Sequence, residues 1–116
     1  MAQILLVEYV YESLERRQRG LSRAGHGVKA AQNFDEGLHA IESGSYDVVV
    51  LGHDIPQQQR NRLAAAAKEA NPLTRVLVLY SAPVEHAELA DALINNSASA
   101  DDLRRTVEYL VRQRTS

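Results

Sequence analysis

The sequence predicts an α/β fold: a doubly wound, five-stranded parallel sheet between two layers of helices, which together form a three-layer sandwich. The main observation is three uninterrupted apolar runs, at residues 4–7, 48–51 and 76–80. Such runs are typical of strands that are buried on both faces, and these strands need helices above and below the sheet. Amphipathic segments with short links separate the runs, and right-handed crossovers then give the doubly wound arrangement.

The central run is Val48–Leu51, in which three of the four residues are β-branched. It leads directly into Gly52, His53 and Asp54 and a turn that is closed by Pro56. In open α/β sheets, ligands bind just outside the carboxyl ends of the strands. We therefore expect any local chemistry at the corner formed by these residues, where the best-placed position is a glycine.

The first half of the chain contains two predicted β–α units. A strand at residues 4–7 precedes a helix at residues 10–24, which ends at a glycine-rich turn. After a short strand at residues 28–31, Asn33 caps the next helix, and Glu36 completes a capping-box-like pair. The predicted buried face of the first helix is formed by Val10, Leu14, Leu21 and Ala24.

The second half contains three further predicted units. Residues 57–62 are polar and are interpreted as a loop that leads into an alanine-rich helix at residues 61–70. After the next strand, a helix is predicted to open at Pro83. The apolar residues of that helix are Ala87, Leu89, Ala90 and Leu93. A short strand at residues 93–95 and a last helix capped by Ser99 complete the order, which is β–α five times over.

Composition excludes several classes of protein. The 116 residues are 45% hydrophobic and 24% charged, which suits one globular domain over residues 1–116. The net charge of −2 disfavours nucleic-acid binding by this domain alone. No apolar stretch approaches the ~20 residues of a membrane span, and the N-terminus does not resemble a secretion signal. The absence of cysteine excludes disulfides and thiolate metal sites. A cytoplasmic protein is the default expectation.

A set of short motifs is spread along the whole chain at characteristic spacing. They are the run at residues 4–7 before an acidic position, Ala24-Gly25-His26, Gly37-Leu38, Tyr46-Asp47 before the central strand, Pro56, Ser81 and Asp102-Leu103. In this combination the chain resembles the response-regulator receiver domain, the CheY-like phosphoacceptor module of two-component signalling. The resemblance implies a flavodoxin-like sheet with the strand order 2-1-3-4-5.

The resemblance also implies where a phosphorylation site would lie. In receiver domains two acidic residues hold Mg²⁺, an aspartate accepts the phosphoryl group, and a hydroxyl and a lysine contact the phosphate. The acidic pair aligns with Glu8 and Tyr9, and the phosphoacceptor aligns with Gly52. The hydroxyl position is Ser81, and the lysine position is Asn96. Only Glu8 and Ser81 keep a side chain of the expected kind.

These departures predict a pseudo-receiver that retains the fold, has lost the reaction and is not an enzyme. Gly52 has no side chain and cannot form an acyl phosphate. Mg²⁺ prefers several carboxylate and phosphate oxygens, so with one carboxylate left we expect neither Mg²⁺ nor another cofactor. Glu8 is expected to pair with Asn96 or a backbone amide. Tyr9 is expected to fill the space that a metal and a phosphate would use.

Asp54 and His53 are the alternative candidates at this corner. Asp54 is the rival phosphoacceptor and, with Glu8, a weak candidate metal ligand. The simpler interpretation is a loop carboxylate that accepts backbone hydrogen bonds. Strand alternation predicts that His53 points away from the side that Gly52 faces, which favours a packing or solvent role. The other histidines have no metal-type spacing; they are His26, His39 and His86.

The predicted function is a protein-interaction module that works without phosphorylation. It would bind a partner or a second copy through the face made by the predicted fourth helix, fifth strand and fifth helix. Two alternatives are an atypical receiver that is phosphorylated or binds metal through Asp54, and the N-terminal regulatory domain of a longer transcription regulator. A small flavodoxin-like enzyme would need a glycine-rich loop after the first strand, and residues 7–12 contain no glycine. Solvated faces are expected for Arg16, Arg17, Arg19, Arg104, Arg105, Arg112 and Arg114.

Overall fold

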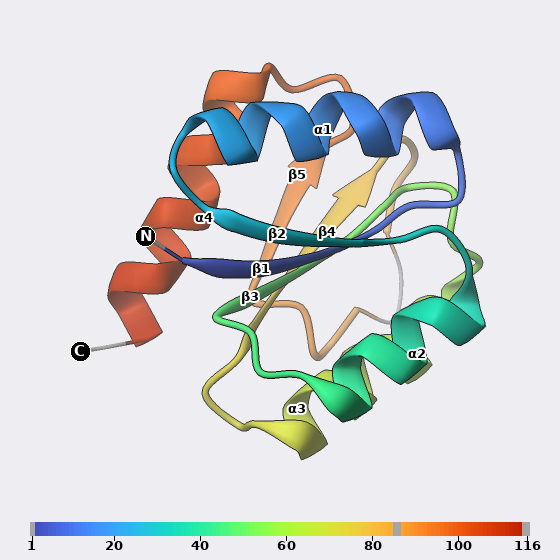
Figure 1. The fold of residues 1–116 in the computed structure, drawn as a ribbon. Helices are drawn as coiled ribbons and strands as arrows, with labels where there is room; N and C mark the ends of the chain where they lie inside the picture. Colours follow the sequence, from blue (N-terminus) through green and yellow to red (C-terminus); the bar gives the residue numbers. More distant parts are fainter. Residues whose placement is uncertain (1, 85–86, 115–116) are drawn as a thin grey trace.

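A five-stranded parallel sheet forms the centre of the molecule (Figure 1). The computed structural model describes residues 2–84 and 87–114. The strands are β1 (Gln3–Val7), β2 (Gly27–Ala31), β3 (Val48–Leu51), β4 (Arg75–Tyr80) and β5 (Ala92–Asn95). Their order in the sheet is β2-β1-β3-β4-β5. The predicted fold class and the strand order implied by the resemblance are therefore confirmed.

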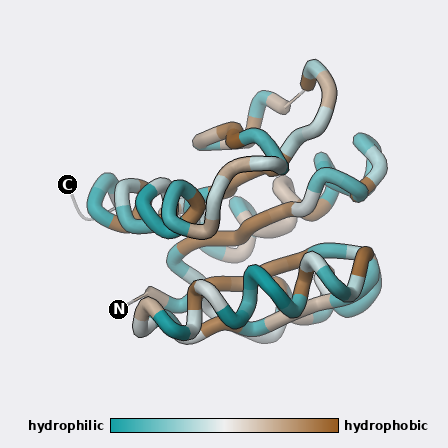
Figure 2. The backbone as a smooth tube through the Cα atoms, turned by 90° about the horizontal axis from the view of Figure 1, so that it is seen from above, coloured by the Kyte–Doolittle hydropathy of each residue, from teal (hydrophilic) through white to brown (hydrophobic). Residues whose placement is uncertain are grey.

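Helices cover both faces of the sheet. They are α1 (Tyr11–Arg23), α2 (Phe34–Ser43), α3 (Gln57–Ala70) and α4 (Ala100–Arg114). α1 and α4 share one hydrophobic cluster with the sheet, and α2 and α3 share the other, so the molecule has three layers (Figure 1). The central strands are the most hydrophobic part of the backbone in Figure 2, as burial on both faces requires. Within the described residues, no helix combines the length and the apolar character needed to cross a membrane.

The strand register gathers the candidate residues at one edge of the sheet. Val7 at the end of β1 pairs with Leu51 at the end of β3, and Leu51 pairs with Val78 near the end of β4. Because all strands run parallel, the residues that follow them leave the sheet at the same edge. Glu8 follows β1 and Gly52 follows β3, so the two positions become neighbours although 44 residues separate them.

The predicted helix termini agree with the observed capping geometry. The side chain of Asn33 accepts a hydrogen bond of 2.9 Å from the backbone N–H of Glu36, and the Glu36 carboxylate accepts one of 2.9 Å from the N–H of Gln32. At the start of α4, Ser99 Oγ accepts from the N–H of Asp102 at 3.1 Å. Gly25 follows α1 with φ at 95°, a backbone conformation that glycine adopts without strain. These capping interactions form between residues that are close in sequence, so they could be predicted without knowledge of the tertiary structure.

The predicted start of α3 and the predicted buried face of α1 were wrong. α3 begins at Gln57, directly after Pro56, so the polar segment that we interpreted as a loop is the first part of the helix. Glutamine and arginine are good helix formers, and polar residues suit a helix face that points to solvent. The predicted buried face of α1 was also partly wrong, because Val10 and Ala24 are exposed and Arg17 is buried.

Among the described residues, the predicted helix after Pro83 is not found. The described residues between β4 and β5, which are 81–84 and 87–91, form bends, turns and loop, and His86 lies outside the described residues. Ala90 donates its N–H to the carbonyl of Ala87 at 3.1 Å, which makes a single turn. The N–H of Asp91 then donates to the carbonyl of Val76 at 2.8 Å. That bond positions the start of β5, and the N–H of Asp91 is then not available for a helical hydrogen bond.

Asp91 also anchors this entry through its side chain, which is 20% exposed. Oδ2 accepts hydrogen bonds from Lys68 Nζ at 2.6 Å and from the N–H of Val76 at 2.7 Å, and Oδ1 lies 3.3 Å from the Arg75 guanidinium. Burial opposes ionisation of this carboxyl. The hydrogen bonds and the two cations outweigh burial and hold the pKa of Asp91 below its ordinary value of 3.8.

This geometry predicts how the contribution of Asp91 depends on pH. A carboxyl whose pKa is lowered by folding stabilises the fold above its unfolded-state pKa, and this contribution fades as the pH falls through the folded-state value. Asp91→Asn is therefore expected to lower the free energy of unfolding at pH 7, and the deficit relative to wild type should shrink below about pH 4. Urea unfolding of both proteins from pH 3 to pH 7 measures the difference. A deficit that grows toward low pH would contradict the assignment.

Candidate functional site

Glu8 lies at the centre of the candidate site and is completely buried. Its backbone N–H donates to the carbonyl of Ala31 at 3.1 Å, so the chain still follows the β1–β2 pairing at this residue. The side chain enters the protein, where Oε1 accepts a hydrogen bond from Nη1 of Arg17. A buried carboxylate needs such a partner, because desolvation of an isolated charge costs several kcal/mol.

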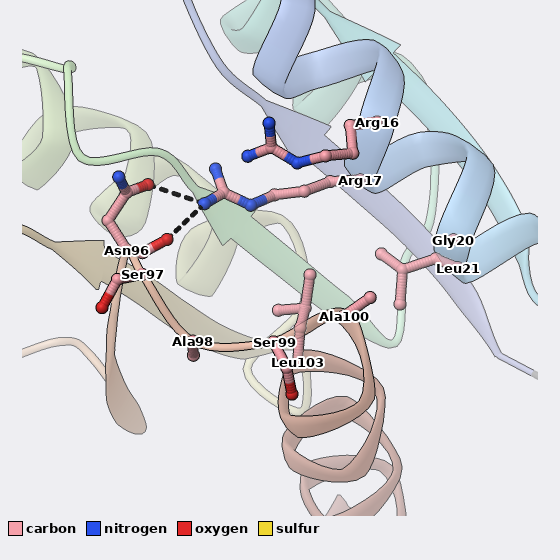
Figure 3. Close-up of a pocket in the computed structure, with 10 residues that line it drawn as sticks. All are labelled: Arg16, Arg17, Gly20, Leu21, Asn96, Ser97, Ala98, Ser99, Ala100 and Leu103. Carbon is pink, nitrogen blue, oxygen red and sulfur yellow. Dashed lines mark hydrogen bonds between the residues drawn. The ribbon is translucent and has the colours of Figure 1, made fainter.

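Arg17 reaches this carboxylate from α1. It shares a helix face with Leu14 and Leu21, three and four residues away, and only 8% of its side chain is exposed. Its Nη2 donates to the backbone oxygen of Asn96 at 2.8 Å and to Asn96 Oδ1 at 2.6 Å (Figure 3). The guanidinium therefore links the end of β1 to the loop after β5, at one side of a cavity of about 310 Å³ between α1 and the start of α4.

Two sequence-based expectations about these residues were wrong. Arg17 does not lie on a solvated face, and Glu8 pairs with Arg17, which stands between Glu8 and Asn96. Asn96 contributes its two oxygen atoms as acceptors. We name the set Glu8, Arg17 and Asn96 the arginine clamp.

Gly52 lies where the space for a side chain is already taken. A Cβ added to it would lie 2.6 Å from Glu8 Cγ, 3.0 Å from Asp54 Oδ1 and 3.1 Å from Glu8 Oε1. The backbone of Gly52 does not require glycine, because among the described glycines only Gly25 has a positive φ. Glycine is therefore required here by crowding, and the crowding comes from two carboxylate side chains.

Asp54 and His53 join Glu8 at this corner, contrary to two expectations. Each of the three residues offers one donor atom, and these atoms lie within 4.8 Å of one another. The alternation rule failed for His53 because β3 ends at Leu51, so that His53 lies in a turn. Neither carboxylate oxygen of Asp54 has a hydrogen-bond partner in the described structure, so the expected bonds to backbone amides are not formed.

The remaining candidate residues lie around this centre. The hydroxyl of Tyr9 donates to Gln59 Oε1 at 2.7 Å, so the ring is directed toward α3, and Glu8 is the residue whose side chain lies against Gly52. Burial, with the carboxylates of Asp54 and Asp35, raises the pKa of the Tyr9 phenol and keeps it neutral. Ser81 lines a separate cavity of about 200 Å³, together with Gly52 and His53.

The charges of the centre are not balanced. Burial raises the pKa of Glu8, the guanidinium of Arg17 opposes this effect, and the nearby carboxylate of Asp54 raises the pKa further. Arg16 also lowers the pKa of Glu8, more weakly than Arg17, and burial with Asp54 outweighs both guanidinium groups. The negative charge of Glu8 is thus not fully compensated, which favours the uptake of a cation or a proton.

Comparison with solved structures identifies the fold. A CheY-like response-regulator receiver domain protein from Methanospirillum hungatei superposes with a TM-score of 0.89 at 21% identity, over 99% of this chain and 97% of that chain. The response regulator TrrA from Thermotoga maritima, in complex with Mg²⁺ and BeF, gives 0.82 at 23% identity, over 95% and 99% of the two chains.

The chain has the receiver-domain fold. The receiver domain of a sensor histidine kinase from Pseudomonas aeruginosa, with a magnesium ion in its active-site cleft, matches with a TM-score of 0.82 at 13% identity, over 96% and 98% of the two chains. The sequence matches no protein-family model and no curated protein. The likeness thus lies in the three-dimensional fold. What the protein can do chemically depends on the residues at the ends of β1 and β3.

The residues of this corner do not fit Mg²⁺. One oxygen of the only carboxylate directly after β1, Glu8, is occupied by Arg17, and Gly52 contributes no side-chain oxygen. The hydroxyl of Tyr9 is directed to Gln59 and remains protonated, which makes it a poor ligand. The carboxylate pair that the resemblance implies for Mg²⁺ is therefore absent; the donors left at the corner are the carboxylates of Glu8 and Asp54 and a nitrogen of His53, and Mg²⁺ prefers oxygen to nitrogen.

Proposed function

We propose that this chain is a signalling module of receiver fold that acts through protein contacts and is not phosphorylated. The observation that carries the proposal is the crowding at Gly52, where a side chain would collide with Cγ of Glu8. An acyl phosphate requires a carboxylate nucleophile, and position 52, where the resemblance places it, has no room for one. On this proposal the domain performs no catalysis.

The arginine clamp supports this proposal in a second way. It fixes a positive charge between the end of β1 and the loop after β5, the region where the resemblance implies a metal ion and a lysine. A charge supplied by α1 is present in every molecule and does not depend on a phosphodonor. The corner is accordingly held in one arrangement, and signalling would depend on which partner is present.

The proposed partner surface lies at the β5 edge of the sheet. β5 is an edge strand, and Leu93 on it and Leu89 just before it are 49% and 42% exposed. Leu93 pairs in register with Val78, so the two share the sheet face that α3 also covers. Since the described residues of the β4–β5 connection contain no helix, the surface differs from the one that we predicted: it consists of this edge and α4, on which Tyr109 is 52% exposed.

The proposal is tested by a titration that separates the metal ion from the phosphate mimic. The backbone amide NMR spectrum is recorded with Mg²⁺ alone and then with Mg²⁺ and beryllofluoride. We expect the second addition to leave the spectrum unchanged, because Gly52 has no carboxylate that beryllofluoride can bind. New shifts around Asp54 and Ser81 on that addition, lost in Asp54→Ala, would instead support an atypical receiver that uses Asp54.

A further inference from the structure

Four buried polar atoms at the ends of β1 and β3 have no hydrogen-bond partner among the described residues. They are Glu8 Oε2, His53 Nδ1, Asp54 Oδ1 and Asp54 Oδ2. Leaving one buried polar group unsatisfied costs about 1–3 kcal/mol, and more when the group is charged. Four such atoms in one place therefore need an explanation, which the arginine clamp does not supply because Arg17 contacts only Oε1 of Glu8.

The residues that carry these atoms, Glu8, His53 and Asp54, also form a group of possible metal ligands in the described structure. One donor atom from each of Glu8, His53 and Asp54 lies within 4.8 Å of the other two. A cation bound at about 2.0–2.2 Å from each donor needs donors roughly 3–4 Å apart. Small side-chain rotations would close the difference. Glu8 is fully buried and directs an unpaired oxygen into the group, so the feature is more than an exposed cluster of acidic residues.

The donor set selects the class of metal. One imidazole nitrogen with two carboxylate oxygens suits Zn²⁺ and related divalent transition-metal ions, whereas Mg²⁺ prefers oxygen alone. The charges are compatible with a cation, because it would lie between two carboxylates of which Arg17 contacts only one. The ligands His53 and Asp54 come from the turn after β3. The proposed set therefore differs from the Mg²⁺ ligands that the resemblance implies, which are an acidic pair after β1 and a phosphoacceptor at position 52.

We infer that Glu8, His53 and Asp54 form a binding site for a divalent transition-metal ion of the zinc type. Arg17 holds Oε1 of Glu8 and leaves Oε2 free for the ion. Three protein ligands leave at least one coordination position for water or for a donor from another molecule. The ion would link the ends of β1 and β3 and satisfy the atoms that are otherwise buried without partners. This inference is independent of the proposed lack of phosphorylation.

The test is a calorimetric titration of metal-stripped protein, without a histidine tag, with Zn²⁺ and separately with Mg²⁺. We expect one equivalent of Zn²⁺ to bind, with an affinity at least about tenfold above that for Mg²⁺. His53→Ala and Asp54→Ala should each weaken Zn²⁺ binding at least about tenfold, whereas the matched control His39→Ala, an exposed histidine on α2, should not.

A second measurement needs no variant and therefore no assumption about folding. The imidazole signals of His53 are followed by NMR in the wild type while Zn²⁺ is added, and only this ring and its neighbours should shift. Absence of Zn²⁺ binding, equal affinity for Mg²⁺, or an equal loss in His39→Ala would overturn the inference. Shifts of the His39 ring that match those of His53 would also overturn it, since binding would then be adventitious. Failure to bind Zn²⁺ with an unchanged response to beryllofluoride would reject the metal site alone.

Discussion

Arg17→Met is expected to lower the free energy of unfolding by about 3–5 kcal/mol, the usual cost of removing one partner of a buried ion pair. Methionine preserves most of the apolar length of the side chain, so the loss comes from the charge and its hydrogen bonds. Glu8 would remain fully buried without a cation, and two oxygens of Asn96 would lose their donor. Domains of this size are stable by only about 5–15 kcal/mol, so the effect is large and is measured by urea unfolding.

The adjacent arginine provides a matched control. Arg16 lies on the same helix and is exposed, so Arg16→Met should change stability by no more than about 0.5 kcal/mol. The double variant Glu8→Leu/Arg17→Met should recover most of the lost stability, because replacing both members of a buried pair by apolar residues is often neutral. Equal effects of Arg16→Met and Arg17→Met, or a double variant less stable than Arg17→Met, would contradict the assigned role of the arginine clamp.

Gly52→Ala is expected to cost about 1–3 kcal/mol, the usual range for overpacking a filled interior. The new Cβ would lie 2.6 Å from Glu8 Cγ, a distance that van der Waals contact does not permit, and Arg17 restrains Glu8 from moving away. Gly52→Asp should cost more, since it adds a third carboxyl group beside Glu8 and Asp54. For the same reason it is not expected to create a phosphorylatable protein.

Another glycine distinguishes crowding from a general effect of substitution. At Gly20 in α1, an added Cβ meets only Ala100 Cβ at 3.8 Å, so Gly20→Ala should stabilise the helix by about 0.5–1 kcal/mol. Gly52→Ala should cost less in the background Glu8→Ala/Arg17→Met, from which the colliding Cγ is absent. A cost that is the same in both backgrounds would show that Glu8 is not the source of the strain.

The buried strands could be predicted well from the sequence because their signal is redundant. β1, β3 and β4 consist of apolar residues that only a doubly covered sheet accommodates, and their order in the chain leaves few topologies. The helix caps at Asn33 and Ser99 are decided by neighbouring residues, so they too were predicted correctly.

The connection after Pro83 and the start of α3 depend on tertiary context, which short patterns do not contain. Residues 57–62 are polar because that part of α3 faces solvent in part, not because it is irregular. Near the start of β5, the bond between Asp91 and Val76 decides the path of the backbone, and its partners are 15 residues apart. Alanine and leucine content alone indicated a helix there.

At the candidate site, the sequence correctly located the group of residues at the ends of β1 and β3, but it did not indicate that Arg17 is buried among them. Arg17 lies among Arg16, Gln18 and Arg19, and composition does not reveal which of them points inward. The signal was nevertheless present, since Arg17 is three residues after Leu14 and four before Leu21, on the buried face of α1. His53 was misplaced because strand alternation was extended past Leu51, where β3 ends, into a turn that does not follow it.

The most direct test of the central claim is whether the protein accepts a phosphoryl group. Wild type is incubated with acetyl phosphate and Mg²⁺, and its intact mass is measured at once by mass spectrometry, beside a receiver domain known to be phosphorylated under the same conditions. We predict that the control gains the mass of one phosphoryl group and that this chain does not. A stoichiometric gain by this chain, abolished in Asp54→Ala, would contradict the account.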